Sequence, residues 1–159
     1  WVSSDNYSGR IVKISNAFVF KGPIKNYSMD FPFVWDEINL PIKYGSDVTL
    51  TNKIIQESAN IYLSKYSDFA KEHWKLMVNK YLIEDAIVES TITLKLTDNW
   101  IEFNLRYVVD YKKRRVTKNA IFTNILDEID KTKGKIVLAS ATFEVVGIPP
   151  VNVEISNKK

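Results

Sequence analysis

The sequence predicts an α+β fold in which helices cover one face of an antiparallel sheet. Residues 89–96 and 100–109 both alternate apolar and polar side chains, and a short polar segment separates them, which is typical of an antiparallel hairpin. Apolar residues recur at helical spacing before this hairpin, over residues 54–66, and after it, over residues 121–129. These patterns together predict a helix, a hairpin and a second helix in that order.

The segment before the first predicted helix is expected to be a strand. Ile38, Leu40 and Ile42 alternate with polar residues over residues 37–42, which places these three apolar side chains on one face. Pro41 has no N–H to donate to a neighbouring strand. We therefore expect this strand to lie at an edge of the sheet or to contain a bulge.

Further segments complete the pattern. Apolar residues at helical spacing predict a second helical stretch over residues 69–82, and the later helix is expected to end near Gly134. Residues 136–146 are predicted to be a last strand. The order is then β-α-(α)-β-β-α-β, a ferredoxin-like sandwich. That fold hosts many functions and does not name one.

The first 34 residues are predicted to be short β-structure, part of an incomplete all-β unit. Residues 10–15 alternate polar and apolar side chains, and residues 17–20 form a compact apolar run. At most three strands fit here, too few to bury a face without partners. We therefore divide the chain into residues 1–34, the ferredoxin-like domain of residues 35–148, and a terminal strand and tail, residues 149–159.

The composition of the 159-residue chain is that of an ordinary globular protein, with 45% hydrophobic and 26% charged residues. The net charge of +3 does not require a polyanionic partner. The absence of cysteine excludes disulfides, thiolate metal sites and cysteine nucleophiles. No apolar run approaches the roughly 20 residues that span a bilayer. The chain begins at Trp1, so we expect it to be a piece of a longer protein.

Candidate catalytic and metal-binding residues are few. His73 is the only histidine and lies beside an apolar helical stripe, so a structural role is favoured over a zinc site. Asp127, Glu128 and Asp130 cluster near a helix C-terminus, where a solvated helix face is favoured over carboxylate catalysis or metal binding. No glycine-rich phosphate-binding motif is present. We expect neither an enzyme nor a bound cofactor or metal.

A basic run, formed by Lys112, Lys113, Arg114 and Arg115, leaves two interpretations open. Ferredoxin-like sheets can bind RNA, so one alternative is an RNA- or small-anion-binding regulatory domain. Residues 106–109 do not supply the aromatic pattern that an RNA-binding sheet needs. A solvated connection between a strand and a helix is therefore favoured, and no nucleic-acid partner is expected.

Two motifs near the N-terminus carry a resemblance to a known family. Residues 8–16 read Ser-Gly-Arg-Ile-Val-Lys-Ile-Ser-Asn, and residues 22–28 read Gly-Pro-Ile-Lys-Asn-Tyr-Ser. They resemble the end of the β-domain of small-conductance mechanosensitive (MscS-type) channels, in which a Gly-Arg-x-Val-x-Ile-Pro-Asn-Ser stretch precedes an Asn-Tyr-Ser element. The matching residues are Gly9, Arg10, Asn16, Asn26, Tyr27 and Ser28.

The resemblance extends over essentially the whole chain. Residues 31–38 and 96–100 are similar to segments of one prokaryotic branch of the family, and the predicted βαββαβ unit matches the family's α/β domain in order and size. Ser15 and Ala17 depart from the family pattern, which more often has Pro and Ser at these positions. The helical stretch over residues 69–82 is also longer than the minimal family pattern.

The resemblance implies that this chain is the cytoplasmic end of a channel subunit in the cell membrane. Membrane helices, including the one that lines the pore, would precede it. Identical subunits would form a ring, heptameric by analogy, and this piece would form the wall of a cytoplasmic vestibule. That wall supports oligomerisation and filters the solutes that reach the pore, and the basic run would add positive potential to it.

The terminal segment is predicted to be an oligomerisation strand. Val151, Val153 and Ile155 alternate with Asn152 and Glu154, and this strand has no hairpin partner within the chain. One such strand from each subunit can close into a parallel barrel that leaves no strand edge unpaired. The resemblance implies that such a barrel seals the vestibule floor.

Overall fold

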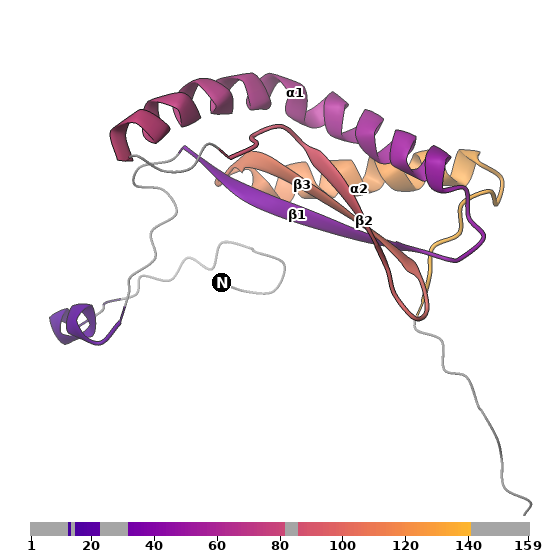
Figure 1. The fold of residues 1–159 in the computed structure, drawn as a ribbon, viewed down its shortest axis with the longest axis horizontal. Coiled ribbons are helices and arrows are strands. Elements are labelled where there is room, and N and C mark those ends of the chain that lie inside the picture. Colours follow the sequence, from indigo (N-terminus) through magenta and orange to yellow (C-terminus); the bar gives the residue numbers. More distant parts are fainter. Residues whose placement is uncertain (1–12, 14, 23–31, 82–85, 141–159) are drawn as a thin grey trace, which may run out of the picture.

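The computed structural model describes residue 13 and residues 15–22, 32–81 and 86–140. It is an α+β structure, shown in Figure 1, in which one antiparallel sheet has the strand order β1-β3-β2. The strands are β1 (Phe33–Ile42), β2 (Thr91–Leu96) and β3 (Ile101–Asp110). The helices are η2 (Asn16–Phe20), a short 3-10 helix, α1 (Val48–Tyr81) and α2 (Arg114–Lys131). Side chains of α1 and α2 share one hydrophobic core with the same face of the sheet.

The predicted hairpin is confirmed. Strands β2 and β3 pair antiparallel from Thr91 opposite Arg106 to Leu96 opposite Ile101. Residues 97–100 connect them. The Thr97 hydroxyl donates to the Trp100 carbonyl at 2.7 Å and accepts from the Trp100 N–H at 3.1 Å, so a turn side chain closes the connection.

The predicted first strand is confirmed but longer than expected. Strand β1 pairs with β3 from Phe33 opposite Asp110 to Ile42 opposite Ile101. Phe33 and Trp35 therefore belong to the strand, and their side chains pack in a second hydrophobic cluster. The boundary predicted between residues 34 and 35 falls inside β1.

The prediction of two separate helical stretches is wrong, because α1 is continuous over 34 residues. Its buried side changes along its length. Ile54, Ile55 and Ser58 are buried in the first half, whereas Ala70 and Trp74 are buried in the second. Ala59 and Leu63 are also buried and lie between these two sets along the helix, so the buried stripe shifts gradually and one helix produces two apolar patterns.

The sheet and helices enclose two hydrophobic clusters. The larger one lies between the sheet and both helices, with Ile38, Leu40 and Ile42 of β1 facing Ile121, Ile125 and Ile129 of α2. The smaller one combines Phe33, Ala70, Trp74, Val88 and Val108, and lies where β1 begins. The second half of α1 runs past the sheet at that end (Figure 1). The Trp35 and Trp74 rings meet edge to face there, with centroids 5.0 Å apart.

The apolar run at residues 17–20 does not form the predicted strand. It forms η2, whose start is capped by the Ser15 hydroxyl accepting from the Ala17 N–H at 3.3 Å. Ser before Asn favours such a capped helical turn over a strand. The rings of Phe18 and Phe20 are 60% and 91% exposed, so η2 buries little of its own apolar surface.

The chain returns to the sheet after α2. The helix ends at Lys131, close to Gly134, where the sequence predicts its end. Lys133 and Gly134 follow with φ 53° and 89°, and at Gly134 this left-handed conformation favours glycine. Leu138 then forms an antiparallel bridge with Ile42, on the edge of β1 away from β3. Pro41 accepts from the Ala139 N–H at 3.0 Å, so its missing N–H faces this second edge. Residues 141–146 of the predicted last strand lie outside the described residues.

Within the part of the chain that the structure describes, no helix is both long enough and apolar enough to cross a bilayer.

The neighbouring residues Ile125 and Leu126 test the packing of α2. Ile125 is 1% exposed and Leu126 is 44% exposed. Ile125→Ala leaves a cavity between α2 and the sheet, so we expect it to lower the free energy of unfolding by about 2–5 kcal/mol. Leu126→Ala is the matched control and should cost less than about 1 kcal/mol. Urea unfolding followed by circular dichroism measures both, and equal costs would contradict the described orientation of α2.

Candidate functional site

A buried carboxylate lies where β1, β3 and α2 meet. Asp36 occupies a position in β1 whose side chain points toward the helices, as do those of Ile38, Leu40 and Ile42. Its side chain is only 4% exposed. A buried charge of this kind is costly unless charged or polar partners surround it.

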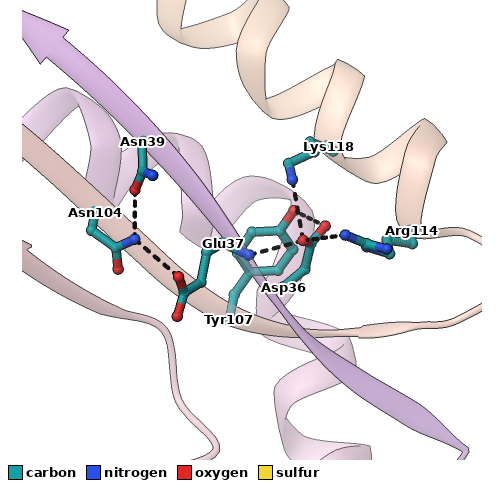
Figure 2. A network of polar contacts seen from close by, with 7 residues as sticks. All are labelled: Asp36, Glu37, Asn39, Asn104, Tyr107, Arg114 and Lys118. Atoms are coloured by element: carbon teal, nitrogen blue, oxygen red, sulfur yellow. Dashed lines mark hydrogen bonds and ion pairs between the residues drawn. The ribbon is translucent and has the colours of Figure 1, made fainter. Parts of the chain in front are cut away.

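Four groups surround the Asp36 carboxylate, as Figure 2 shows. The Arg114 guanidinium and the Lys118 ammonium both donate to Oδ1, at 3.0 Å and 3.1 Å. The Glu37 backbone N–H also donates to Oδ1, at 2.9 Å. The Tyr107 hydroxyl, from the residue opposite Asp36 in β3, donates to Oδ2 at 3.2 Å. We call these four side chains, of Asp36, Tyr107, Arg114 and Lys118, the Asp36 network.

The network fixes the ionisation of both acidic groups. Burial acts to raise the pKa of Asp36, but the hydrogen bonds from Arg114, the Glu37 N–H and Lys118 outweigh it, so the pKa lies below its usual value. Burial, together with the nearby charge of Asp36, raises the pKa of Tyr107 far above that of an ordinary tyrosine. Asp36 is therefore ionised and Tyr107 neutral at any physiological pH.

This ionisation suits a structural role. A general acid or base works best with a pKa near the working pH, and neither Asp36 nor Tyr107 has one. Both carboxylate oxygens are also engaged, because Arg114, Lys118 and the Glu37 N–H donate to Oδ1 and Tyr107 donates to Oδ2. The carboxylate is therefore not open to an incoming ligand. The Asp36 network is best described as an electrostatic tie between the sheet and α2.

Helix α2 needs such a tie at its first turn. Its N-cap residue, Lys113, makes no side-chain capping bond, and no acidic residue lies in the first turn. Positive side chains at a helix N-terminus are unfavourable, because the helix dipole is positive there. Asp36 supplies from β1 the negative charge that the start of α2 lacks, and pairs with Arg114 and Lys118 four residues apart.

A second polar group lies on the opposite face of the sheet (Figure 2). The Asn104 amide donates to Asn39 Oδ1 at 2.6 Å and to Glu37 Oε2 at 3.3 Å. Asn39 and Asn104 are paired directly across β1 and β3. Nearby, the Arg106 guanidinium lies 5.8 Å from the centroid of Trp35. These contacts make a solvated, mixed-charge surface rather than a basic one.

The four residues of the predicted basic run, 112–115, have different environments in the structure. Lys112 and Lys113 are exposed in the turn between β3 and α2, and Arg115 is exposed on α2. Arg114 instead turns toward Asp36. The predicted connection thus consists of Lys112 and Lys113, whereas Arg114 and Arg115 belong to α2, and the Arg114 guanidinium binds the buried carboxylate.

The remaining predicted residues are not brought together. Of the family-motif residues, Asn16 begins η2, while Gly9, Arg10, Asn26, Tyr27 and Ser28 lie outside the described residues. The predicted barrel strand, Val151, Asn152, Val153, Glu154 and Ile155, also lies outside them. His73 packs on Phe69, with ring centroids 4.1 Å apart. Among the described residues no group of three or more His, Asp or Glu side chains is arranged to hold a metal ion.

Sequence reasoning missed the Asp36 network, although one signal pointed to it. Asp36 lies two residues before Ile38 and therefore on the same face of the strand as Ile38, Leu40 and Ile42. It is a charged residue on an otherwise apolar face. The predicted strand began at residue 37, so Asp36 was left outside it. A strand extended by one residue would have predicted a buried carboxylate in need of cationic partners.

Comparisons with known proteins add no assignment, since no protein-family model and no curated protein matches this chain.

The pH dependence of stability tests the Asp36 network. Because its pKa is depressed in the folded protein, Asp36 stabilises the fold fully above the unfolded value of about 3.9. That contribution is lost as the pH falls through the lower, folded value. Asp36→Asn should cost about 2 kcal/mol at pH 7, because Arg114 and Lys118 lose their partner. It should also flatten the loss of stability below about pH 4.

Two further variants complete this test. Tyr107→Phe removes one hydrogen bond to the carboxylate and should cost about 1 kcal/mol. Asp98→Asn is the control. It changes an exposed residue of the hairpin turn and should not alter how the free energy of unfolding falls at acidic pH. Chemical unfolding between pH 2 and 7 provides the measurement, and an identical acid limb in Asp36→Asn and the unmodified chain would rule out the network as a source of stability.

Proposed function

We propose that this chain is the vestibule module of an MscS-type mechanosensitive channel subunit. In this proposal it is not an enzyme. It forms part of the cytoplasmic wall of a ring of identical subunits, supports their association and restricts which solutes reach the pore. Membrane helices of the same subunit would anchor it to the cell membrane.

The return of the chain to β1 is the observation that supports this proposal best. Residues 137–139 lie on the edge of β1 away from β3, so the order from that edge is the returning segment, β1, β3 and β2. A ferredoxin-like sandwich has this order, with its last strand beside its first. The resemblance of the N-terminal motifs implies the same domain, in the same position after the β-domain.

Exposed apolar surface supports association between subunits. Leu94 and Leu96 of β2 are 45% and 67% exposed, and no described strand pairs with the outer edge of β2. Tyr62, Phe69 and Leu76 of α1 are also exposed and recur every seven residues. Apolar patches of this kind mark surfaces at which proteins associate. Such contacts fit a module that works as part of a ring.

The distribution of charge favours the channel proposal over the RNA-binding alternative. Arg114 is engaged by Asp36, and the open face of the sheet carries Glu37 and Glu102 beside Lys95 and Arg106. A nucleic-acid surface needs a net basic patch with stacking side chains. The open face is close to neutral.

Channel activity of the natural full-length gene product tests the proposal. Expressed in bacteria that lack their own mechanosensitive channels, it should rescue survival after a fall in osmolarity and give tension-gated currents in excised patches. The matched control is the same protein with its pore-lining helix deleted. Absence of membrane spans upstream of Trp1 in that gene product, or micromolar RNA binding with a steep salt dependence, would contradict the proposal.

The terminal strand offers a second test. The proposal expects residues 151–155 to close the ring as a barrel, so a full-length protein ending at Pro149 should lose ring-sized assemblies in size-exclusion chromatography with light scattering. A protein ending at Ser156 keeps the strand and should assemble normally. An unchanged ring in the shorter protein would show that this strand is not the seal.

A further inference from the structure

A hollow of about 300 Å³ lies between α1 and the segment that leads into β2. One wall is the side of α1 that carries Gln56, Asn60, Ser64 and Ser67, which follow each other at four-, four- and three-residue spacing and so share one side of the helix. Residues 88–90, which precede β2, form the opposite wall. Ala59, Leu63 and Tyr107 form the floor.

Short side chains explain why the hollow is not filled by packing. Ser64, Ser67 and Ser90 reach only one bond beyond Cβ, and Ala59 lies beneath them. Interiors are normally packed without gaps of this size. A volume of about 300 Å³ corresponds to roughly ten water molecules at about 30 Å³ each, or to one small organic molecule.

The walls present hydrogen-bonding groups that have few partners. The hydroxyls of Ser64, Ser67 and Ser90 make no hydrogen bond with any described residue. Gln56 donates to Asn60 at 3.1 Å within the same wall, which leaves further donor and acceptor sites on both amides. A ligand that carries several hydroxyl groups matches walls of this kind, while the apolar floor matches its C–H face.

Two carboxylates, of Asp68 and Glu89, lie at the rim of the hollow and determine which ligand charge is favoured. Glu89 is paired with Lys71 at 2.9 Å, and this contact lowers the pKa of Glu89 and raises that of Lys71. Asp68 makes no ion pair with the described residues. Lys71 also interacts with Asp68 through space, so the described rim groups are two carboxylates and one ammonium. Their net negative charge attracts a cation and repels an anion.

We propose that this hollow binds a small polyhydroxylated molecule that carries an amino group. Asp68 pairs with the ammonium, the serine hydroxyls bind the ligand hydroxyls, and the ligand lies over Ala59 and Leu63. This site shares only Tyr107 with the Asp36 network, and its test needs no channel activity. Failure of one proposal is therefore distinguishable from failure of the other.

Three sugars of one skeleton and different charge test the proposal: glucosamine, glucose and glucuronate. Titration of each into the full chain is followed by two-dimensional ¹H–¹⁵N NMR, at a pH where the amine is protonated. We expect the order of affinity to be glucosamine, glucose, glucuronate, with shifts concentrated at residues 56–68 and 88–90. Asp68→Asn should weaken glucosamine about fivefold, as loss of one exposed ion pair predicts, and leave glucose unchanged.

Two controls make the result specific. Asp127→Asn removes one exposed carboxylate from α2 and should not change the binding of any sugar. Ser64→Phe fills the hollow from an exposed helix position and should abolish binding while the remaining resonances keep their positions. Absence of binding by all three sugars, equal affinities for them, or equal effects of Asp68→Asn and Asp127→Asn would overturn the proposal.

Discussion

The charge that β1 carries into the interior at Asp36 constrains how the rest of the chain packs. An unpaired carboxylate at this depth would cost several kcal/mol. The groups that neutralise it, Arg114 and Lys118, both lie in the first turns of α2. The start of α2 is therefore held against the place where Asp36 and Tyr107 face each other. Desolvation offsets much of the attraction in a buried ion pair, whereas removal of one partner is costly because the other charge stays buried.

The position of α2 follows from that tie. Arg114 and Lys118 bind Asp36 at the start of the helix. Further along it, Ile121, Ile125 and Ile129 are spaced by four, share one side and pack in the main core against the sheet. The helix ends at Lys131, and the chain then turns at Gly134 and returns beside β1. The bridge between Leu138 and Ile42 is this return. One buried charge thus links the register of the sheet to the place of the returning segment.

Helix α1 is longer than the strands of the sheet, and this difference determines how its second half packs. A helix of 34 residues is about 51 Å long, whereas a strand of ten residues spans about 33 Å. The first half of α1 shares the main core with α2, and the second half must bury a different side against Phe33 and Val88. The exposed side chains of Tyr62, Phe69 and Leu76 lie on the side that is no longer covered.

The sequence was informative where a pattern is local. The hairpin and α2 were predicted correctly, because alternation and helical spacing each act within a few residues. The continuity of α1 was not predicted, since the spacing shows a change of buried side but not whether the helix breaks. The pairing of Asp36 with Arg114 was not predicted either. These residues are 78 positions apart, and only the packed sheet and helix bring them within hydrogen-bond distance.

The two edges of the sheet limit how copies of this chain can associate in the proposed ring. Pairing of β2 with β2 of a neighbour is a two-fold arrangement, and a ring with an odd number of subunits cannot be built from two-fold contacts alone. Pairing of β2 with a neighbour's β1 is blocked near Ile42, where residues 137–139 already lie. In the proposed ring, association of these domains would then rest on side chains such as Leu94 and Leu96, and closure on the proposed terminal strand. A module of this kind can leave openings between subunits while its ring stays closed.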